Sequence, residues 1–256
     1  MSLTTIDKYL NLVHTRPQSF TQGKLKIITN KSILMKYENQ NKCDLGLLYE
    51  STYHLLVKDL VSDGNSYFAY ERIIKQNSDN AVVIIPIYQG KFVLLNQFRH
   101  SMRDYQLCFP RCFGESNLSI NENAIKELRE ELGVNVLSCS VIGKVIADSG
   151  LCGEKVNICL CKITKPKLMY NYEGINNIKI TNTEELVSLI NSEKINDGYT
   201  LSAFSLYIAQ KNFKYNHLYF KPVRYPIQFC QISFYIIEFC NFRSCMSEKV
   251  DYLSWS

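Results

Sequence analysis

Three glutamates close together near the middle of the chain are the residues best suited to chemistry. Glu127, Glu130 and Glu131 stand in the string KELREELGV. Like charges three and four positions apart on a helix destabilise it by roughly 0.2–0.5 kcal/mol per pair, a cost that a divalent cation would offset. On a helical wheel the three glutamates share one flank, beside an apolar stripe of Ala124, Ile125, Leu128 and Leu132.

Mg²⁺ suits such a set of carboxylates. It takes carboxylate and phosphate oxygens as ligands while keeping several waters, and it can neutralise and polarise a pyrophosphate. The same string is also compatible with a solvated helix face laced with Lys–Glu pairs. The glutamates alone therefore leave both interpretations open.

The helix that carries the glutamates has a well-defined start. Ser119 and Glu122 form the S-x-x-E pattern of a capping box, which gives Glu122 a structural task. This pattern predicts a helix from Ile120 to Leu132.

The chain before this helix predicts two groups of strands. Segments rich in β-branched and aromatic residues follow a short helix expected at Ile6–Val13, and they predict an N-terminal antiparallel sheet. The nearly continuous apolar runs AVVIIPIY and KFVLLNQF, with a turn at Gln89–Gly90, predict central strands covered on both faces. The N-terminal segments are Lys24–Tyr37, Leu47–Leu60 and Ser66–Ile74.

The chain after the helix predicts further strands and then two closing helices. We expect the strands at Asn135–Ala147 and Lys155–Ile163, and the helices at Glu184–Ile195 and Leu201–Phe213. Thr181 with Glu184 predicts a capping box for the first of these helices. A sheet, a middle helix and closing helices together indicate an α/β sandwich with a mixed sheet.

This order of elements divides the chain into three parts. We expect an N-terminal β region over residues 1–78, a main domain over residues 79–213, and an aromatic-rich tail of unknown role over residues 214–256. The tail is compatible with an extra strand pair or docked segment, with a membrane-surface or dimer contact, and with no stable fold.

The composition excludes several classes of protein. A chain of 256 residues that is 46% hydrophobic and 21% charged can bury a sizeable core. Its net charge of +5 is mild and evenly spread, so we expect no nucleic-acid partner. No stretch approaches the ~20 apolar residues of a membrane span and no signal peptide is evident, so we expect a cytoplasmic protein.

The cysteines do not predict a disulfide framework. Ten of them occur at irregular spacings, which favours reduced packing residues. Cys108 and Cys112 lack the companions that a zinc site needs.

The string KELREELGV resembles the second half of the Nudix box, G-x5-E-x7-R-E-U-x-E-E-x-G-U, in which U is apolar. The resemblance implies that Glu127, Glu130 and Glu131 bind Mg²⁺, or Mn²⁺ in its place. Leu128, Gly133 and Val134 also match the box.

Three positions depart from the box. Strict spacing puts Cys112 at its glycine, Leu118 at its first glutamate and Lys126 at its arginine. A glycine allows a backbone conformation or close approach that cysteine resists, and lysine lacks the planar fork of arginine. Glu115 lies close enough in sequence to replace the missing glutamate.

The sequence around the box is similar to the ADP-ribose pyrophosphatase branch of the family. In NQFRHSMRDYQLCFPRCFGE this similarity implies that Arg99 contacts the substrate and that the backbone carbonyl of Arg111 binds a metal. In ADSGLCGEKVNICLCK it implies that Glu154 accepts a proton from water or completes the metal shell. By themselves, Arg99 could equally cap a strand and Glu154 could pair with Lys155.

The resemblance runs from about Leu47 to Phe213 and implies the Nudix α/β/α sandwich. It implies a Mg²⁺-dependent hydrolase that splits the pyrophosphate of a nucleoside-diphosphate derivative, with Glu130, Glu131 and Glu154 as catalytic residues. ADP-ribose, which would give AMP and ribose 5-phosphate, or another nucleotide sugar is the implied substrate. N-terminal strands often build a homodimer in this branch, so we expect a dimer.

A second hypothesis comes from the three altered box positions. The chain could be a nucleotide-binding or regulatory protein with the same fold and impaired catalysis. It would then bind nucleotides without hydrolysing them.

Overall fold

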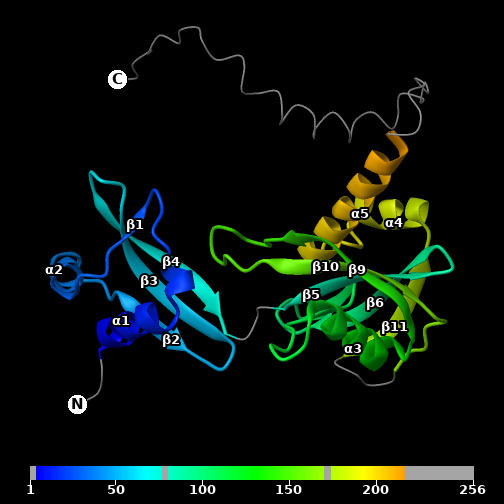
Figure 1. Cartoon of the computed structure of the whole chain (residues 1–256), viewed down its shortest axis with the longest axis horizontal. Coiled ribbons are helices and arrows are strands. Elements are labelled where there is room, and N and C mark those ends of the chain that lie inside the picture. Colours follow the sequence, from blue (N-terminus) through cyan, green and yellow to red (C-terminus); the bar gives the residue numbers. More distant parts are fainter. Residues whose placement is uncertain (1–3, 77–79, 170–173, 217–256) are drawn as a thin grey trace, which may run out of the picture. The chain divides into compact units, whose positions relative to one another are not determined.

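The computed structural model describes residues 4–76, 80–169 and 174–216. The described residues up to Lys211 lie in the first of the two units into which the chain divides. The fold below is that of the first unit, with strands and helices labelled in Figure 1. Most of the predicted tail, from residue 217 onwards, lies outside the described residues.

A small antiparallel sheet forms in the N-terminal region. Its central strand β3 (His54–Ser62) pairs with β2 (Gly46–Glu50), with the short β1 (Lys26–Ile27) and, along its full length, with β4 (Tyr67–Lys75). Helices α1 (Thr5–Thr15) and α2 (Lys31–Asn41) and a 3-10 turn at Pro17–Phe20 precede or interrupt these strands. One buried core is formed by apolar residues of α1, α2, strands β2 to β4 and the segments between them: Ile6, Tyr9, Leu12, Phe20, Leu34, Leu45, Leu47, Leu55, Val57, Leu60 and Ile74.

One polar network lies inside this core. The carboxylate of Asp59 is only 2% exposed; it accepts a hydrogen bond of 2.5 Å from the Tyr9 hydroxyl and one of 2.5 Å from Arg72 Nε. The guanidinium of Arg72 also lies over the ring of Phe20, 4.9 Å from its centroid. Burial, followed by the negative charge of Asp59, raises the pKa of Tyr9. These hydrogen bonds link α1 to the neighbouring strands β3 and β4.

The predicted strand at Lys24–Tyr37 is wrong. Only Lys26–Ile27 is a strand, and Lys31–Asn41 is helix α2. Asn30 caps this helix because its side chain accepts a hydrogen bond from the Ile33 amide. Leu34 is the residue that α2 buries in the core, so one apolar anchor and a cap outweigh the β-branched residues nearby.

The larger sheet has seven strands in the order β11-β6-β5-β10-β9, with β7 paired to β6 and β8 to β5. Only the β5–β10 pair is parallel among its described pairings, so the predicted mixed sheet is confirmed. The tight turn between β5 and β6 uses Gln89 and Gly90, both at positive φ, as a two-residue hairpin requires. The strands are β5 (Val82–Tyr88), β6 (Lys91–Arg99), β7 (Asp104–Cys108), β8 (Arg111–Cys112), β9 (Val136–Val145), β10 (Val156–Ile163) and β11 (Ile175–Thr181).

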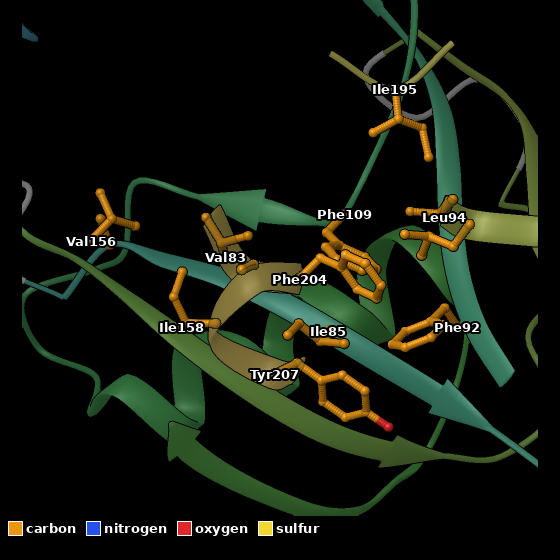
Figure 2. Close-up of a cluster of buried hydrophobic side chains, with 13 residues drawn as sticks. Val83, Ile85, Phe92, Leu94, Phe109, Val156, Ile158, Ile195, Phe204 and Tyr207 are labelled. Atoms are coloured by element: carbon orange, nitrogen blue, oxygen red, sulfur yellow. The ribbon is translucent and has the colours of Figure 1, made fainter. Parts of the chain in front are cut away.

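Helices cover both faces of this sheet (Figure 1). Alternate residues of β5 point to opposite sides, so Val82 and Ile84 pack with α3 (Ile120–Leu132), while Val83 and Ile85 pack with α5 (Gly198–Asn216). Figure 2 shows the second core, where Phe92 lies edge-on to the rings of Phe204 and Tyr207, with centroids 5.6 and 5.1 Å away. Helix α4 (Thr183–Asn191) contributes Leu186 to the same core. The α/β/α sandwich is therefore confirmed.

The helix termini test the sequence patterns most closely. The helix predicted at Ile120–Leu132 has these bounds, and both hydrogen bonds of its capping box form between Ser119 and Glu122. The capping box predicted for Thr181 and Glu184 is wrong by one residue, because Asn182 is the cap and its side chain accepts from the Glu185 amide at 2.8 Å. Thr181 instead ends β11, a strand that the sequence did not predict.

Asp59→Ala should destabilise the protein by about 3 kcal/mol or more, because it leaves Arg72 without its buried counter-charge. Urea unfolding followed by circular dichroism measures this free energy. Glu71→Gln is the matched control, since Glu71 pairs with Lys58 one residue away on the same two strands but is half-exposed. It should change stability by less than about 0.5 kcal/mol, and equal losses for the two variants would contradict the role given to Asp59.

Candidate active site

The three predicted metal-binding glutamates do not share one environment. Glu127 and Glu131, one turn apart on α3, are buried, with 8% and 1% of their surface exposed. The Glu130 side chain is 38% exposed and lies 3.8 Å from the ammonium of Lys126. Helix α3 therefore turns two of its carboxylates toward the sheet and leaves the third at the rim.

Cys112 lies against the first buried glutamate. It ends β8, opposite Val82, and its thiol forms a hydrogen bond with the Glu127 carboxylate. Burial, and after it the charge of Glu127, raises the pKa of the Cys112 thiol to about 12. The thiol therefore stays protonated at neutral pH and donates to the carboxylate.

The position that requires glycine is Gly114, two residues after Cys112. Gly114 has a φ of +77°, and a Cβ there would lie 2.3 Å from the carbonyl oxygen of Asn80. Cys112 is extended strand and needs no such freedom. The loop that enters α3 is thus fixed by a close backbone contact, displaced from where strict spacing with the box puts it.

The other two departures from the box lie near each other. Lys126 forms an ion pair with Glu115, and both side chains are more than a third exposed. Leu118 contributes its backbone carbonyl, which accepts a hydrogen bond of 2.8 Å from the Asn80 side chain. Glu115 thus lies beside the lysine that stands at the arginine position.

Arg99 lies at the end of β6 and lines a pocket. One terminal nitrogen donates to the sulfur of Cys108 at 3.1 Å, while its Nε is buried without a hydrogen-bond partner. A buried guanidinium N–H that is not hydrogen-bonded is costly unless a ligand satisfies it. Arg99 is therefore placed to receive an anion.

Arg111 is held from two sides at the same pocket. Its guanidinium pairs with Asp197 at 2.9 Å and lies over the Tyr199 ring, 5.1 Å from the centroid. Asp197 in turn accepts hydrogen bonds from the amide and hydroxyl of Thr200, in the first turn of α5. The backbone of Arg111 pairs with β5 at Val83 and adjoins Cys112, which contacts Glu127.

Glu154 pairs with Lys75 rather than with its neighbour Lys155. The side chains of this ion pair are 7% and 19% exposed, so it is largely shielded from water. The Glu154 loop is also tied to β4 by a hydrogen bond of 2.8 Å from the Ile73 amide to the Leu151 carbonyl. The N-terminal sheet therefore supplies the cation that holds this carboxylate.

The pocket has a volume of about 420 Å³ and collects residues from all these segments. Arg99, Arg111 and Glu127 line it; Glu130, Glu131 and Glu154 do not, although Glu154 is bound to Lys75, which does. Burial is the largest of the effects that raise the pKa of the Tyr199 hydroxyl. The charges of Lys75, Glu154 and Arg111 also act on this hydroxyl. The full lining is His54, Lys75, Ala81, Val82, Val83, Arg99, Arg111, Cys112, Phe113, Glu127, Val156 and Tyr199.

The sequence missed four of these residues. No sequence motif marks them, and they lie in separate parts of the chain: His54, Lys75, Phe113 and Tyr199. Phe113 lies in NQFRHSMRDYQLCFPRCFGE, the stretch that resembles the family, but the resemblance implies no role for it. His100, which follows Arg99 in the chain, is exposed, with its Nδ1 3.0 Å from an Arg103 nitrogen, and it does not line the pocket.

The carboxylates of α3 are the side chains that could hold a metal ion. Within the described ranges no three His, Cys, Asp or Glu side chains form a group that could hold one. Glu127 and Glu131 nevertheless fit a hard cation, because buried carboxylates need positive charge nearby and their oxygens are the ligands that Mg²⁺ prefers. Glu130 at the rim would have to turn inward to join them.

No family model matches the chain. Over 98 residues it is 26% identical to the ADP compounds hydrolase NudE of Escherichia coli (strain K12), a match that covers 38% of this chain and 52% of that protein. The chain thus spans about half the length of this curated relative.

None of the described helices is long and apolar enough to cross a membrane.

A solved structure supports the same relationship. The fold is similar to the crystal structure of an ADP compounds hydrolase, with a TM-score of 0.57 and 19% identity over 68% of this chain and 93% of that one. The fold and the weak sequence similarity together confirm the resemblance of this chain to the Nudix hydrolases, in their ADP-ribose pyrophosphatase-like branch.

Proposed function

We propose that the protein is a metal-dependent hydrolase that splits the pyrophosphate of ADP compounds, with ADP-ribose as the first substrate to test. The observation that carries this proposal is the unpartnered, buried Nε of Arg99 in a pocket that also has Lys75, Arg111 and the carboxylate of Glu127 on its walls. An anion between these cations would satisfy Arg99. A diphosphate also brings the oxygens that a cation held by Glu127 would bind.

The proposed metal ligands are Glu127, Glu131, Glu130 and the backbone carbonyl of Arg111. Mg²⁺ or Mn²⁺ bound there would neutralise the diphosphate and make its phosphorus more electrophilic. The buried pair on α3 supplies fixed carboxylates, and the Cys112 thiol orients Glu127 by donating to it. Arg99 and Arg111 bind the diphosphate from the strand side of the pocket.

Glu154 is the proposed proton acceptor. Water attacks one phosphorus, the bond from that phosphorus to the bridging oxygen breaks, and Glu154 takes the proton from the water. Lys75 holds Glu154 before the substrate arrives, and an anionic diphosphate competes for the same ammonium. Substrate binding would thereby weaken the ion pair and free the carboxylate for its task.

Aromatic side chains at the pocket suit a nucleobase. Phe113 lines the pocket and stacks on Tyr53, with ring centroids 6.1 Å apart and 22° between the planes. Both rings are more than half exposed, and the Lys75 ammonium lies 5.3 Å from the Phe113 centroid. A purine could stack on such a surface, which favours a nucleotide over inorganic pyrophosphate.

A homodimer and a cytoplasmic location stay predictions.

Two observations favour the alternative, a nucleotide-binding protein with impaired catalysis. Glu130 lies near Lys126, and the described residues contain no group of three metal-binding side chains. The alternative keeps the cationic pocket and its ligand but loses turnover. Binding and hydrolysis must therefore be measured separately.

The metal proposal predicts that the protein converts ADP-ribose to AMP and ribose 5-phosphate with Mg²⁺ and stops when EDTA is added. Glu131→Gln should lower kcat by roughly 100-fold or more, because the metal contributes several kcal/mol to the transition state. Phosphorus NMR detection of AMP is the measurement, and the exposed Glu184→Gln is the control.

Two results separate the rival hypotheses. Calorimetric binding of ADP-ribose without AMP formation would support the impaired protein. Turnover that survives both EDTA and Glu131→Gln would remove the metal assignment altogether. GDP-mannose, UDP-glucose and dinucleotides in the same assay would test the substrate class.

The anion site predicts that Arg99→Met lowers kcat/KM by roughly 10- to 100-fold, since a charge-assisted hydrogen bond contributes about 1.5–3 kcal/mol. Most of the change should be a rise in KM. Arg103→Met is the control, because Arg103 lies in the next loop, is exposed and does not line the pocket. Equal kinetics for the two variants would show that Arg99 only caps its strand.

The proton-transfer role predicts that Glu154→Gln lowers kcat by roughly 10²- to 10⁴-fold, the usual contribution of a general base. KM should stay the same or fall, because the glutamine keeps the shape of the side chain and no longer competes with the diphosphate for Lys75. Lys155→Met is the control, since this neighbouring lysine is exposed. A loss of activity with Lys155→Met and none with Glu154→Gln would contradict the assignment.

A further inference from the structure

Three cysteines meet on two neighbouring strands, and none of them lines the pocket proposed for hydrolysis. Cys139 of β9 lies directly opposite Cys161 of β10 in the antiparallel register. Cys159 is two residues before Cys161 and therefore points to the same face of the sheet. The hydrogen-bonding interactions of the Cys139 thiol with the thiols of both Cys159 and Cys161 place the three sulfurs together.

The three thiols differ in their access to solvent. Cys159 and Cys161 are fully buried in the core under α3, whereas Cys139 is half-buried. The sulfur of Cys139 also lies 3.5 Å from the side-chain oxygen of Asn121, in the first turn of α3. A reagent can thus reach Cys139 first, with the other two behind it.

The surroundings of Cys139 favour its thiolate. Hydrogen bonds from Cys159, and to a smaller degree from Cys161, lower the pKa of the Cys139 thiol. The pKa values of its two neighbours are raised, chiefly by the same hydrogen bonds and by burial. The positive end of a 13-residue helix lies close by and stabilises negative charge further.

The strand geometry allows a bond between the opposite pair. Residues opposite each other in antiparallel strands have Cα atoms about 4.5–5.5 Å apart, within the range of about 4.4–6.8 Å found for disulfides. β9 is an edge strand, so it can move toward β10 without breaking other pairings. The register irregularities of this pair lie outside the stretch that holds the cysteines.

We propose that Cys139 and Cys161 form a peroxide-sensitive thiol pair. The Cys139 thiolate attacks hydrogen peroxide, an S–O bond forms, the O–O bond breaks and hydroxide leaves. The Cys161 sulfur then attacks the sulfenic acid, the S–S bond forms, and the oxygen leaves as water after the Cys161 proton is transferred. Two thiols and one peroxide give one disulfide and two waters, and a dithiol reductant reverses the reaction.

Cys161 rather than Cys159 is the partner because of the register. Cys159 lies opposite Val141, so its sulfur reaches Cys139 only along the diagonal. Diagonal neighbours are about 7–8 Å apart at Cα, which is too far for an unstrained disulfide. Cys159 therefore polarises the reactive sulfur, and Cys161 bonds to it.

The test treats the full chain with one to five equivalents of hydrogen peroxide, blocks the remaining thiols with N-ethylmaleimide and maps tryptic peptides without reduction. The expected product links EELGVNVLSCSVIGK, which contains Cys139, to VNICLCK, which contains both Cys159 and Cys161. Because trypsin leaves those two cysteines in one peptide, Cys159→Ala and Cys161→Ala distinguish them. Cys159→Ala should retain the link and Cys161→Ala should lose it.

Cys43 provides the control for reactivity, since it is also half-buried but lies elsewhere in the chain. Without peroxide, Cys139 should react with N-ethylmaleimide at pH 6 at least about tenfold faster than Cys43. Cys43→Ser should leave the cross-link unchanged.

The wild-type peptide map shows whether Cys139 is linked to the peptide that holds Cys159 and Cys161, and a link retained in Cys159→Ala identifies Cys161 as the partner even if Cys161→Ala folds poorly. Oxidation of Cys43 or Cys112 while Cys139 stays a free thiol would overturn the proposal. So would a link that persists in Cys161→Ala and disappears in Cys159→Ala.

Discussion

The burial of two like-charged carboxylates on one helix is the constraint on which the site depends. Glu127 and Glu131 face the sheet from consecutive turns of α3, and an ionised carboxylate in such a place is costly unless positive charge or hydrogen bonds compensate it. The helix cannot turn them outward, because its apolar stripe already packs on β5 and β10. The compensation must come from what surrounds them, namely the Cys112 thiol, the cations of the pocket and any cation that binds there.

The N-terminal region contributes a positive charge to the same pocket. Lys75 ends β4 and reaches the pocket, where it pairs with Glu154 and lies over Phe113. The loop that carries Glu154 is hydrogen-bonded to β4 as well, so the proposed proton acceptor is held by a sheet other than the one that carries the metal-binding helix. The larger sheet thus supports the helix that carries the proposed metal ligands, and the N-terminal sheet holds the proposed proton acceptor.

Local patterns predicted the central part of this structure well. The capping box at Ser119 and the apolar run AVVIIPIY depend on neighbours within a few residues, and they gave the bounds of α3 and the place of β5 closely. The errors occurred where one or two side chains decide the local structure. Asn30 and Leu34 make a helix of a segment that reads as a strand, and Asn182 rather than Thr181 caps α4.

The pocket could be predicted only in part, because its walls are set by tertiary pairing. Family resemblance pointed to Arg99, Arg111 and Glu127, whereas Lys75 and Tyr199 are brought to them by contacts between distant segments. Strict spacing also put the special glycine at Cys112, while the close approach to Asn80 occurs at Gly114. A spacing rule only counts residues, so it does not detect that the loop before α3 reaches its helix along a different path.

The parallel pairing of β5 with β10 has a consequence for how the protein is made. These strands are far apart in the chain, and the ion pair between Arg111 and Asp197 joins segments that are similarly distant. Pairing over such separations is slow, and a chain emerging from the ribosome must wait for its later segments. β10, Asp197 and Tyr199 all follow the acidic helix in the chain, so ligand capture can begin only after the residues up to Tyr199 have been synthesised.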